Sequence, residues 1–326
     1  MGERCTAPVF IVGCPRSGTT LLYHMLLSAG GFVYYRAESH VFDVIVPRFG
    51  NLASREAKER LMERWLASHF FARTELEPEP LRAMVMAECR NGGDFLRIVM
   101  GAMAERQGVP RWADCTPAHV LHMSQIKETI PEALFIHIIR DGRDVAMSLC
   151  REGWVSPFPW DRGRELEVAA LQWEWIVSRG RREGQKLGED YLEISFENLV
   201  RSPRQTLPEV GSFIESELDY DRILRVGIGS VSKPNTSFGI EGEAFNPVGR
   251  WREKLDMERL AALESLIGGL LGELGYETGA NRLELDRRPR RRLMRMGYHS
   301  YRSLKHWAKT RTPLSRYLTD VGLLSQ

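Results

Sequence analysis

Residues 8–22 read PVFIVGCPRSGTTLL, which is an apolar run, a turn with two glycines and a second apolar run. The first run has the length and β-branched content of a buried strand, and the second begins a helix. Gly13 and Gly18 stand five residues apart and the hydroxyl of Thr20 follows, which is the spacing of a phosphate-binding loop. The stretch therefore predicts an anion-binding turn between a strand and a helix.

The chemistry of this turn favours an anion without the usual lysine. The N–H groups and the dipole at a helix start attract negative charge, and Gly18 lets the backbone approach the ligand closely. Thr19 and Thr20 add hydroxyl donors. Loops that bind magnesium nucleotides carry lysine at the position of Thr19, whereas here the positive charge stands earlier, at Arg16. This departure weighs against an ordinary ATP site.

A second strand, turn and helix are predicted at residues 134–149, which read LFIHIIRDGRDVAMSL. Arg140 ends the apolar run, so its guanidinium is expected at the carboxyl edge of the sheet, where α/β folds bind ligands. An ion pair with Asp141 or Asp144 is the alternative role for Arg140. Ser148 follows on the next helix. Together with the first turn, this pattern predicts an anion site at that edge.

The remaining patterns predict the fold class. A third strand is expected at residues 191–195, and a long loop at 227–248. Buried strands that alternate with helices predict a three-layer α/β fold with a mainly parallel sheet flanked by helices. We expect one domain over residues 1–280 and a basic, helical extension over 281–326. Helices are expected between the strands, at residues 53–72, 93–107, 117–129, 164–187 and 256–274.

Composition excludes collagen-like, disordered and membrane-spanning proteins. The 326 residues are 43% hydrophobic and 27% charged, and no apolar run is long enough to span a bilayer. The N-terminus lacks a secretory pattern, and five cysteines without CxxC spacing predict neither disulfides nor a zinc site. His119 and His122 stand three apart, but buried or solvent-facing histidines are commoner than ligands. These features predict a cytoplasmic protein without a bound metal.

Charge is distributed unevenly along the chain. The net charge is +2, but residues 281–326 carry 12 Lys or Arg against 3 Asp or Glu. The rest of the chain is therefore acidic. Because an acidic surface repels phosphate backbones, nucleic-acid binding is not expected. The extension could be a solvated helix. It could instead place the protein at an anionic membrane surface, because apolar side chains interleave with its charges: Leu293, Met294, Met296, Tyr298, Leu304 and Trp307.

The two turns resemble the signatures of sulfotransferases that use 3′-phosphoadenosine 5′-phosphosulfate (PAPS), a family with bacterial, carbohydrate and tyrosylprotein members. Residues 15–21 (PRSGTTL) resemble its 5′-phosphosulfate loop, and residues 134–149 resemble its second signature. The resemblance implies a P-loop-like fold, PAPS as donor and adenosine 3′,5′-bisphosphate as product. It places the residues from Arg16 to Thr20, Ser17 included, at the 5′ end, and Arg140 and Ser148 at the 3′-phosphate.

Two later stretches resemble the family more weakly. Residues 193–203 (EISFENLVRSP) carry Phe196 where the family usually has a tyrosine near the adenine, so stacking is kept and a hydroxyl is lost. Residues 249–252 (GRWR) resemble a late Gly-x-Trp-Lys segment that closes over the nucleotide. Lys233 and Arg250 are then expected to contact phosphate, with ordinary surface charge as the alternative.

The resemblance also suggests a catalytic base. Residues 37–43 (AESHVFD) resemble a Glu-x-His-x-Phe-Asp segment of carbohydrate sulfotransferases, which assigns the base to Glu38, with His40 as second choice. Glu38 could instead pair with Arg36 or cap a helix. Cys115 stands where many relatives carry a lysine that faces the sulfonate, so another cation, Lys233 or Arg36, would have to supply that charge.

These features together predict in-line transfer of a sulfuryl group from PAPS to an acceptor hydroxyl. Glu38 would take the acceptor proton and Arg16 would stabilise the leaving oxygen. A sulfuryl group carries less charge than a phosphoryl group, so no metal is required in principle. Residues 154–160 (WVSPFPW) could form an acceptor wall for an apolar, phenolic or lipid-linked acceptor. A Mg-ATP-dependent small-molecule kinase and a non-catalytic nucleotide-binding module are the alternatives.

Overall fold

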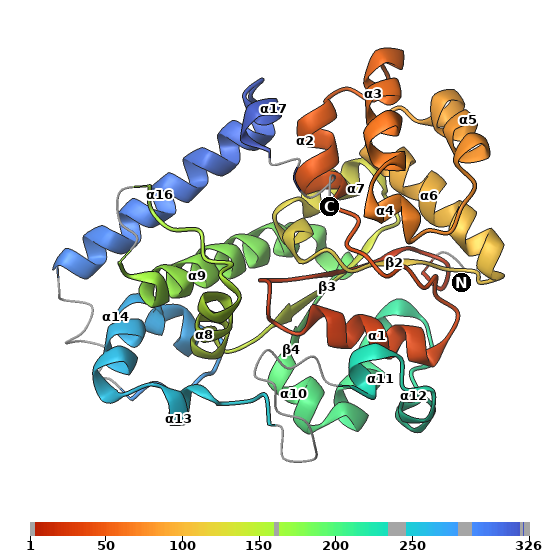
Figure 1. The fold of residues 1–326 in the computed structure, drawn as a ribbon. Helices are drawn as coiled ribbons and strands as arrows, with labels where there is room; N and C mark the ends of the chain where they lie inside the picture. Colours follow the sequence, from red (N-terminus) through yellow and green to blue (C-terminus); the bar gives the residue numbers. More distant parts are fainter. Residues whose placement is uncertain (1–3, 160–162, 234–245, 280–288, 320–321, 323–326) are drawn as a thin grey trace.

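A parallel sheet of four strands forms the centre of the molecule (Figure 1). The computed structural model describes residues 4–159, 163–233, 246–279, 289–319 and 322. The strand order is β2–β1–β3–β4, and each neighbouring pair runs parallel. All carboxyl ends therefore meet at one edge. The strands are β1 Val9–Val12, β2 Ala113–Asp114, β3 Leu134–Ile139 and β4 Tyr191–Ser195.

Alternate residues of the strands pack into two separate cores. Phe10 lies opposite Phe135 in the register of β1 and β3, and their rings stack with centroids 5.4 Å apart. Val9 and Ile11 point to the other face and join a second cluster. Both clusters are fully buried, as the continuous apolar strands predict. The predicted three-layer α/β architecture is confirmed.

Helices cover both faces of the sheet (Figure 1). One face is covered by α1 Thr19–Ala29, α10 Phe196–Arg201, α11 Pro203–Ile214 and α12 Tyr220–Val226. The other face carries α6 Gly92–Gln107, α7 Met123–Thr129, α8 Gly142–Glu152, α9 Glu165–Gly184 and α14 Met257–Glu273. The other described helices are α2 Val46–Phe49, α3 Arg55–Leu66, α4 His69–Ala72, α5 Pro78–Glu88, α13 Trp251–Lys254 and α17 Ser315–Leu318.

Two predicted helices are interrupted in the structure. The stretch 53–72 divides into α3 and α4, because Ser68 adopts an extended conformation and its side chain accepts a hydrogen bond from the Phe71 N–H. The stretch 117–129 divides at His122 into a 3₁₀ helix, Pro117–Leu121, and α7. β2, α5, α11 and α12 were not predicted. Two-residue β2 is too short to show a periodicity, and α11 contains Pro208.

The described part of the C-terminal extension consists mainly of two helices, α16 and α17. Helix α16, Pro289–Arg311, packs against α9 and α14, and α17 lies against α2 (Figure 1). The predicted domain boundary near residue 280 and most of the predicted loop 227–248 lie outside the described residues. Among the helices that are described, none combines the length and the apolar character needed to cross a membrane.

Candidate active site

The turn between β1 and α1 has the geometry of an anion cradle. Gly18 caps α1 at φ 98°, and a Cβ there would lie 2.3 Å from the Phe196 ring, so glycine is required on both counts. Arg16 also has a positive φ, of 74°, which strains a residue with a side chain. Among the described residues no side chain caps α1, and its first turn holds no acidic residue. No carboxylate of α1 itself therefore offsets the positive end of the helix, although Glu152 lies 3.9 Å from Arg16.

Two buried donor atoms, one in this turn and one just after β3, have no partner among the described residues. Among the described residues, neither Ser17 Oγ nor Arg140 Nε has a hydrogen-bond partner, and both atoms are shielded from solvent. A buried donor left without a partner is costly, so such groups usually await a ligand or water. A phosphate or sulfate group at the turn would satisfy Ser17, and a second anionic group at the end of β3 would satisfy Arg140. The residues at this turn therefore fit an oxyanion.

The structure brings the residues of the two predicted signatures together. Arg16 Nε donates to Ser148 Oγ at 2.9 Å, and Arg140 Nη1 donates to the Arg16 carbonyl at 3.1 Å. The Arg140 guanidinium lies over the Phe196 ring, 4.6 Å from its centroid. Burial lowers the pKa of Arg140, against the opposing effect of Asp144, whose carboxylate is 3.7 Å away. Cations from two separate strand ends thus converge on one point.

Residues 247–251 close over this point. Arg140 Nη2 donates to the Pro247 carbonyl at 2.6 Å. Asp144 accepts from the Gly249 N–H at 2.8 Å and from the Trp251 N–H at 3.0 Å. The carboxylate thereby anchors the weak GRWR motif, a role that sequence reasoning missed. In the sequence, the only indication of this role was that Asp144 follows Arg140 by four residues.

The two residues predicted to contact phosphate from the late segments differ in burial. Arg250 is half-buried at the start of α13, directly beside the anchored Trp251. Lys233 is exposed and follows a 3₁₀ turn, Gly229–Val231. Residues 234–245, which come next, lie outside the described residues.

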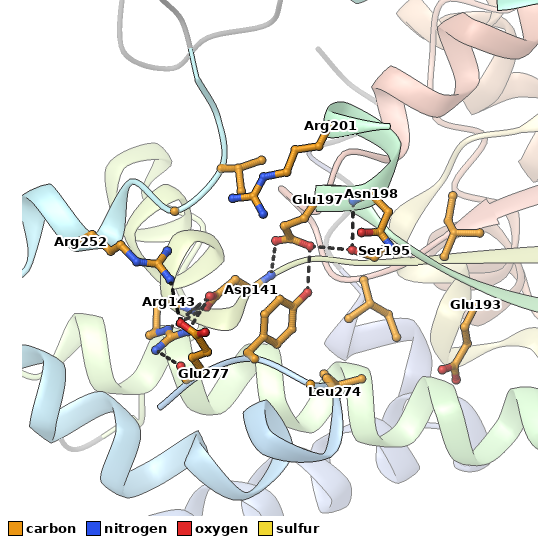
Figure 2. A pocket seen from close by; sticks show the side chains of 16 residues that line it. Asp141, Arg143, Glu193, Ser195, Glu197, Asn198, Arg201, Arg252, Leu274 and Glu277 are labelled. Atoms are coloured by element: carbon orange, nitrogen blue, oxygen red, sulfur yellow. Dashed lines mark hydrogen bonds and ion pairs between the residues drawn. The ribbon is translucent and has the colours of Figure 1, made fainter. Parts of the chain in front are cut away.

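A polar cavity of about 480 Å³ opens at the carboxyl ends of β3 and β4 (Figure 2). Glu197 Oε1 accepts from the Asp141 N–H at 2.9 Å, and its Oε2 accepts from the Ser195 hydroxyl at 3.0 Å and the Tyr276 hydroxyl at 2.9 Å. Arg201 also lines the cavity. This hydrogen-bonding lining suits a polar ligand next to Arg140. Gly249 and Arg252 of this lining belong to the predicted GRWR segment, whereas the sequence had assigned no role to Glu197, Arg201 or Tyr276.

The predicted base segment is fastened beside the phosphate loop. The Ser39 N–H donates to Thr116 Oγ1 at 2.9 Å, and the Gly13 N–H donates to the Pro117 carbonyl at 3.3 Å. Cys115 directly precedes Thr116 and Pro117, and its thiol interacts with the Thr19 hydroxyl and with the charge of Glu38. Burial raises the pKa of the Cys115 thiol well above its ordinary value, so it remains a neutral, small buried group.

Glu38 begins a chain of charged side chains that runs into the core. Glu38 Oε2 lies 3.2 Å from His40 Nε2, and His40 Nδ1 lies 2.9 Å from Asp43 Oδ2. Asp43 Oδ1 in turn lies 3.6 Å from His119 Nε2, and His119 Nδ1 lies 2.9 Å from Asp114 Oδ1. The outer end is open, because the Glu38 side chain is 45% exposed whereas His40 is 14% exposed.

The charge state of His40 follows from its neighbours. Burial disfavours the imidazolium, but Asp43 and Glu38 more than offset this and raise the pKa of His40 to about 10. His40 is therefore charged at neutral pH and holds Glu38 in place. It also adopts a left-handed conformation, φ 49°, at the start of a π-helical turn, Val41–Ile45. Asp43 was part of the quoted motif, but its link to His119 was not predicted.

The remaining candidate residues differ in their exposure and in their neighbours. Arg36 is exposed, stacks over Tyr34 at 4.9 Å and lines a second cavity of about 280 Å³. Trp154 is 51% exposed and lies 5.4 Å from the Arg16 guanidinium, whereas Phe158 is buried. Thr20 is exposed at the start of α1. In the described part of the chain, no group of three or more His, Cys, Asp or Glu side chains is arranged to hold a metal ion.

Comparison with known proteins identifies the family of the chain. A model of the sulfotransferase family matches residues 8–220. Protein-tyrosine sulfotransferase A of Caenorhabditis elegans is 25% identical over 295 residues, which cover 86% of this chain and 70% of that protein.

Two solved structures share the fold. The sulfotransferase domain of the Synechococcus PCC 7002 olefin synthase aligns with a TM-score of 0.52 and 21% identity, over 83% of this chain and 95% of that domain. The sulfotransferase domain of the curacin biosynthetic pathway aligns with a TM-score of 0.51 and 17% identity, over 83% and 98%. Since the family model spans more than half of the chain, the protein belongs to the sulfotransferase family.

Proposed function

We propose that this sulfotransferase moves a sulfuryl group from PAPS to an acceptor hydroxyl. The observation that carries the proposal is the convergence of Arg16, Arg140 and Ser148 beside the uncapped start of α1. These groups lie at the carboxyl edge of a parallel sheet, where a phosphorylated nucleotide binds most readily. The buried Ser17 hydroxyl, which has no partner in the described part of the chain, supports the same ligand class.

Each part of the site has a distinct task in this proposal. PAPS, when bound, supplies an activated sulfuryl group on its 5′ side. Ser17, Gly18, Thr19 and Thr20 hold that side through N–H and hydroxyl donors, while Arg140 and Ser148 hold the 3′-phosphate. Phe196 and the polar cavity receive the adenine of the nucleotide. Lys233 and Arg250 approach the phosphates from the late segments.

Glu38 is the proposed general base. It takes the proton of the acceptor hydroxyl while the new oxygen–sulfur bond forms and the bond to the phosphate oxygen breaks. Arg16 and the N–H groups at the start of α1 stabilise the charge that develops on the departing oxygen. His40 is a positioning residue rather than a base, because an imidazolium with a pKa of about 10 has no free lone pair at neutral pH.

The acceptor is proposed to be a phenolic or other apolar hydroxyl compound. The exposed Trp154 beside Arg16 offers a flat surface on which an aromatic acceptor can stack. The name of the C. elegans relative, a protein-tyrosine sulfotransferase, is in keeping with a phenolic hydroxyl. We further propose that the protein works in the cytoplasm and that its C-terminal extension contacts a membrane.

Thermal shift measurements test the donor class. Without added metal, adenosine 3′,5′-bisphosphate should raise the melting temperature more than ATP with magnesium does. Ser148→Ala removes the acceptor of the Arg16 Nε bond, so it should weaken bisphosphate binding by about 1–3 kcal/mol. Ser212→Ala, at an exposed position on α11, is the matched control.

Transfer is then tested with labelled PAPS and a panel of phenols and alcohols. Labelled product formed without ATP would support the proposal. Stabilisation by magnesium ATP alone would contradict it and favour a kinase. Bisphosphate binding without transfer to any acceptor would favour a non-catalytic nucleotide-binding module.

A further inference from the structure

Helix α16 is strongly basic along its whole length. Its 23 residues include eight Lys or Arg and no Asp or Glu. It lies on the outside of the molecule, across α9 and α14 (Figure 1). The sequence alone left open whether this segment is a solvated appendage or an interaction surface. The orientation of its side chains decides between a solvated appendage and an interaction surface.

The inner face of α16 is fixed to the domain. Tyr298 is fully buried, and its hydroxyl donates to the Ser156 carbonyl at 3.1 Å. Arg295 Nε donates to the buried Glu174 carboxylate at 2.8 Å. Trp175 Nε1 donates to Ser303 Oγ at 3.1 Å. The helix is therefore held in one rotational setting, and its outward side chains form a defined surface.

The outer face of α16 is apolar. Leu293, Met296, Leu304 and Trp307 are respectively 71, 59, 64 and 55% exposed. Their spacing of three, eight and three residues places them on one stripe of a helix. By contrast Met294 and Tyr298, which belong to the same predicted amphipathic pattern, face the domain. A stripe of large apolar side chains in water is costly and marks a binding surface.

Cations flank this stripe. Arg290, Arg292, Lys305 and Arg311 are exposed, and Arg316 on the neighbouring α17 is exposed as well. A helix with an apolar stripe bordered by Lys and Arg is the physical signature of a segment that lies in the headgroup region of a bilayer. We propose that the outer face of α16 docks the protein on an anionic lipid surface, with Leu304 and Trp307 inserted among the acyl chains.

Charge and hydrophobicity together favour lipid over other partners. A second copy of the chain would bring a second acid-free cationic helix against the first, and the two would repel. A nucleic acid would neutralise the cations but leave Leu293 and Leu304 in water. An anionic bilayer satisfies both features, because its headgroups pair with Lys and Arg while its interior accepts the apolar stripe.

The docking helix also contacts the loop next to the active site. The Tyr298 hydroxyl on α16 donates to the Ser156 carbonyl, and Phe158 packs edge-on against the Tyr298 ring with centroids 5.3 Å apart. Trp154, in the same loop, lies beside Arg16. The loop of residues 154–158 thus contacts both the proposed docking helix and Arg16 of the proposed active site.

Sedimentation with lipid vesicles tests the proposal on the full-length protein. The protein should bind vesicles that contain phosphatidylglycerol far more strongly than vesicles of phosphatidylcholine alone, and added salt should weaken this binding. The double variant Leu304→Ser/Trp307→Ser should lose at least about tenfold in affinity. The double variant Arg292→Gln/Lys305→Gln should lose the preference for anionic lipid.

Matched controls separate docking from folding. Leu224→Ser/Val226→Ser removes two exposed apolar side chains from α12, on the far side of the molecule (Figure 1), and should bind vesicles as the parent does. All variants should keep the parent melting temperature and its response to adenosine 3′,5′-bisphosphate, since these positions are exposed. That response also shows that a failure of docking is distinct from a failure of the proposed donor site.

Three outcomes would overturn the proposal. The first is the absence of vesicle binding, or binding that Leu304→Ser/Trp307→Ser leaves unchanged. The second is self-association, seen by analytical ultracentrifugation, that the same variant abolishes, which would make the stripe an interface between copies. The third is tighter binding to a short DNA duplex than to anionic vesicles.

Discussion

Glu38 and His40 stand two residues apart and touch, but only Glu38 faces solvent enough to meet an acceptor. Glu38→Gln keeps the size of the side chain and removes its basicity. We expect this variant to bind adenosine 3′,5′-bisphosphate as the parent does and to transfer sulfuryl about 10²–10⁴-fold more slowly. Glu209→Gln, at an exposed position on α11, is the control. Parent-like turnover in Glu38→Gln would rule out Glu38 as the base.

His40 gives the stability of the protein a pH dependence. Its pKa rises from an ordinary value of 6.5 to about 10 in the folded chain, because Asp43 and Glu38 outweigh burial. A raised pKa stabilises the folded state in full below about pH 6.5, and this contribution is lost as the pH rises toward 10. The free energy of unfolding in urea should therefore fall between these pH values, by at most a few kcal/mol. His40→Gln should flatten the fall, and an unchanged profile would contradict the assigned charge.

The start of α1 depends on a single glycine. Gly18→Ala combines a φ of +98° with a Cβ placed 2.3 Å from the Phe196 ring, so the turn and the ring must both shift. We expect the variant to lose bisphosphate binding and to melt at a lower temperature. Gly101→Ala in α6 is the matched control, because a Cβ there meets no atom of the described residues within 4 Å. That control should be neutral or stabilising by up to about 1 kcal/mol. Intact ligand binding in Gly18→Ala would contradict the assigned loop geometry.

Arg143 joins distant parts of the chain through a buried ion-pair network. It is 1% exposed and contacts Asp141 at 2.8 Å and Glu264 of α14 at 2.6 Å, with the Trp251 ring 3.7 Å away. Arg143→Met would leave two buried carboxylates without a cation, which costs about 3–5 kcal/mol. Urea unfolding should show this loss, whereas Arg55→Ala, which breaks only an exposed pair with Glu59, should leave the midpoint unchanged. Equal midpoints for both variants would contradict the role of the network.

The parts of the site that sequence predicted are those that depend on neighbours along the chain. The cradle at Gly18 follows from a strand, a turn and a helix in direct succession. Arg140 was placed at the site because it ends a buried strand, and parallel strands bring their carboxyl ends to one edge. The Arg16–Ser148 contact then joins the two predicted motifs.

Contacts between segments far apart in the chain were decided by the tertiary structure. The carboxylate of Asp144 anchors the N–H groups of residues 249 and 251, more than a hundred positions away. The link from His40 through Asp43 to His119 likewise needs two loops to pack together. Such contacts leave no periodic pattern in the sequence, because they depend on how loops pack rather than on local repeats. For the same reason a basic, apolar segment became an oriented surface only when Tyr298 and Arg295 anchored α16 to the domain.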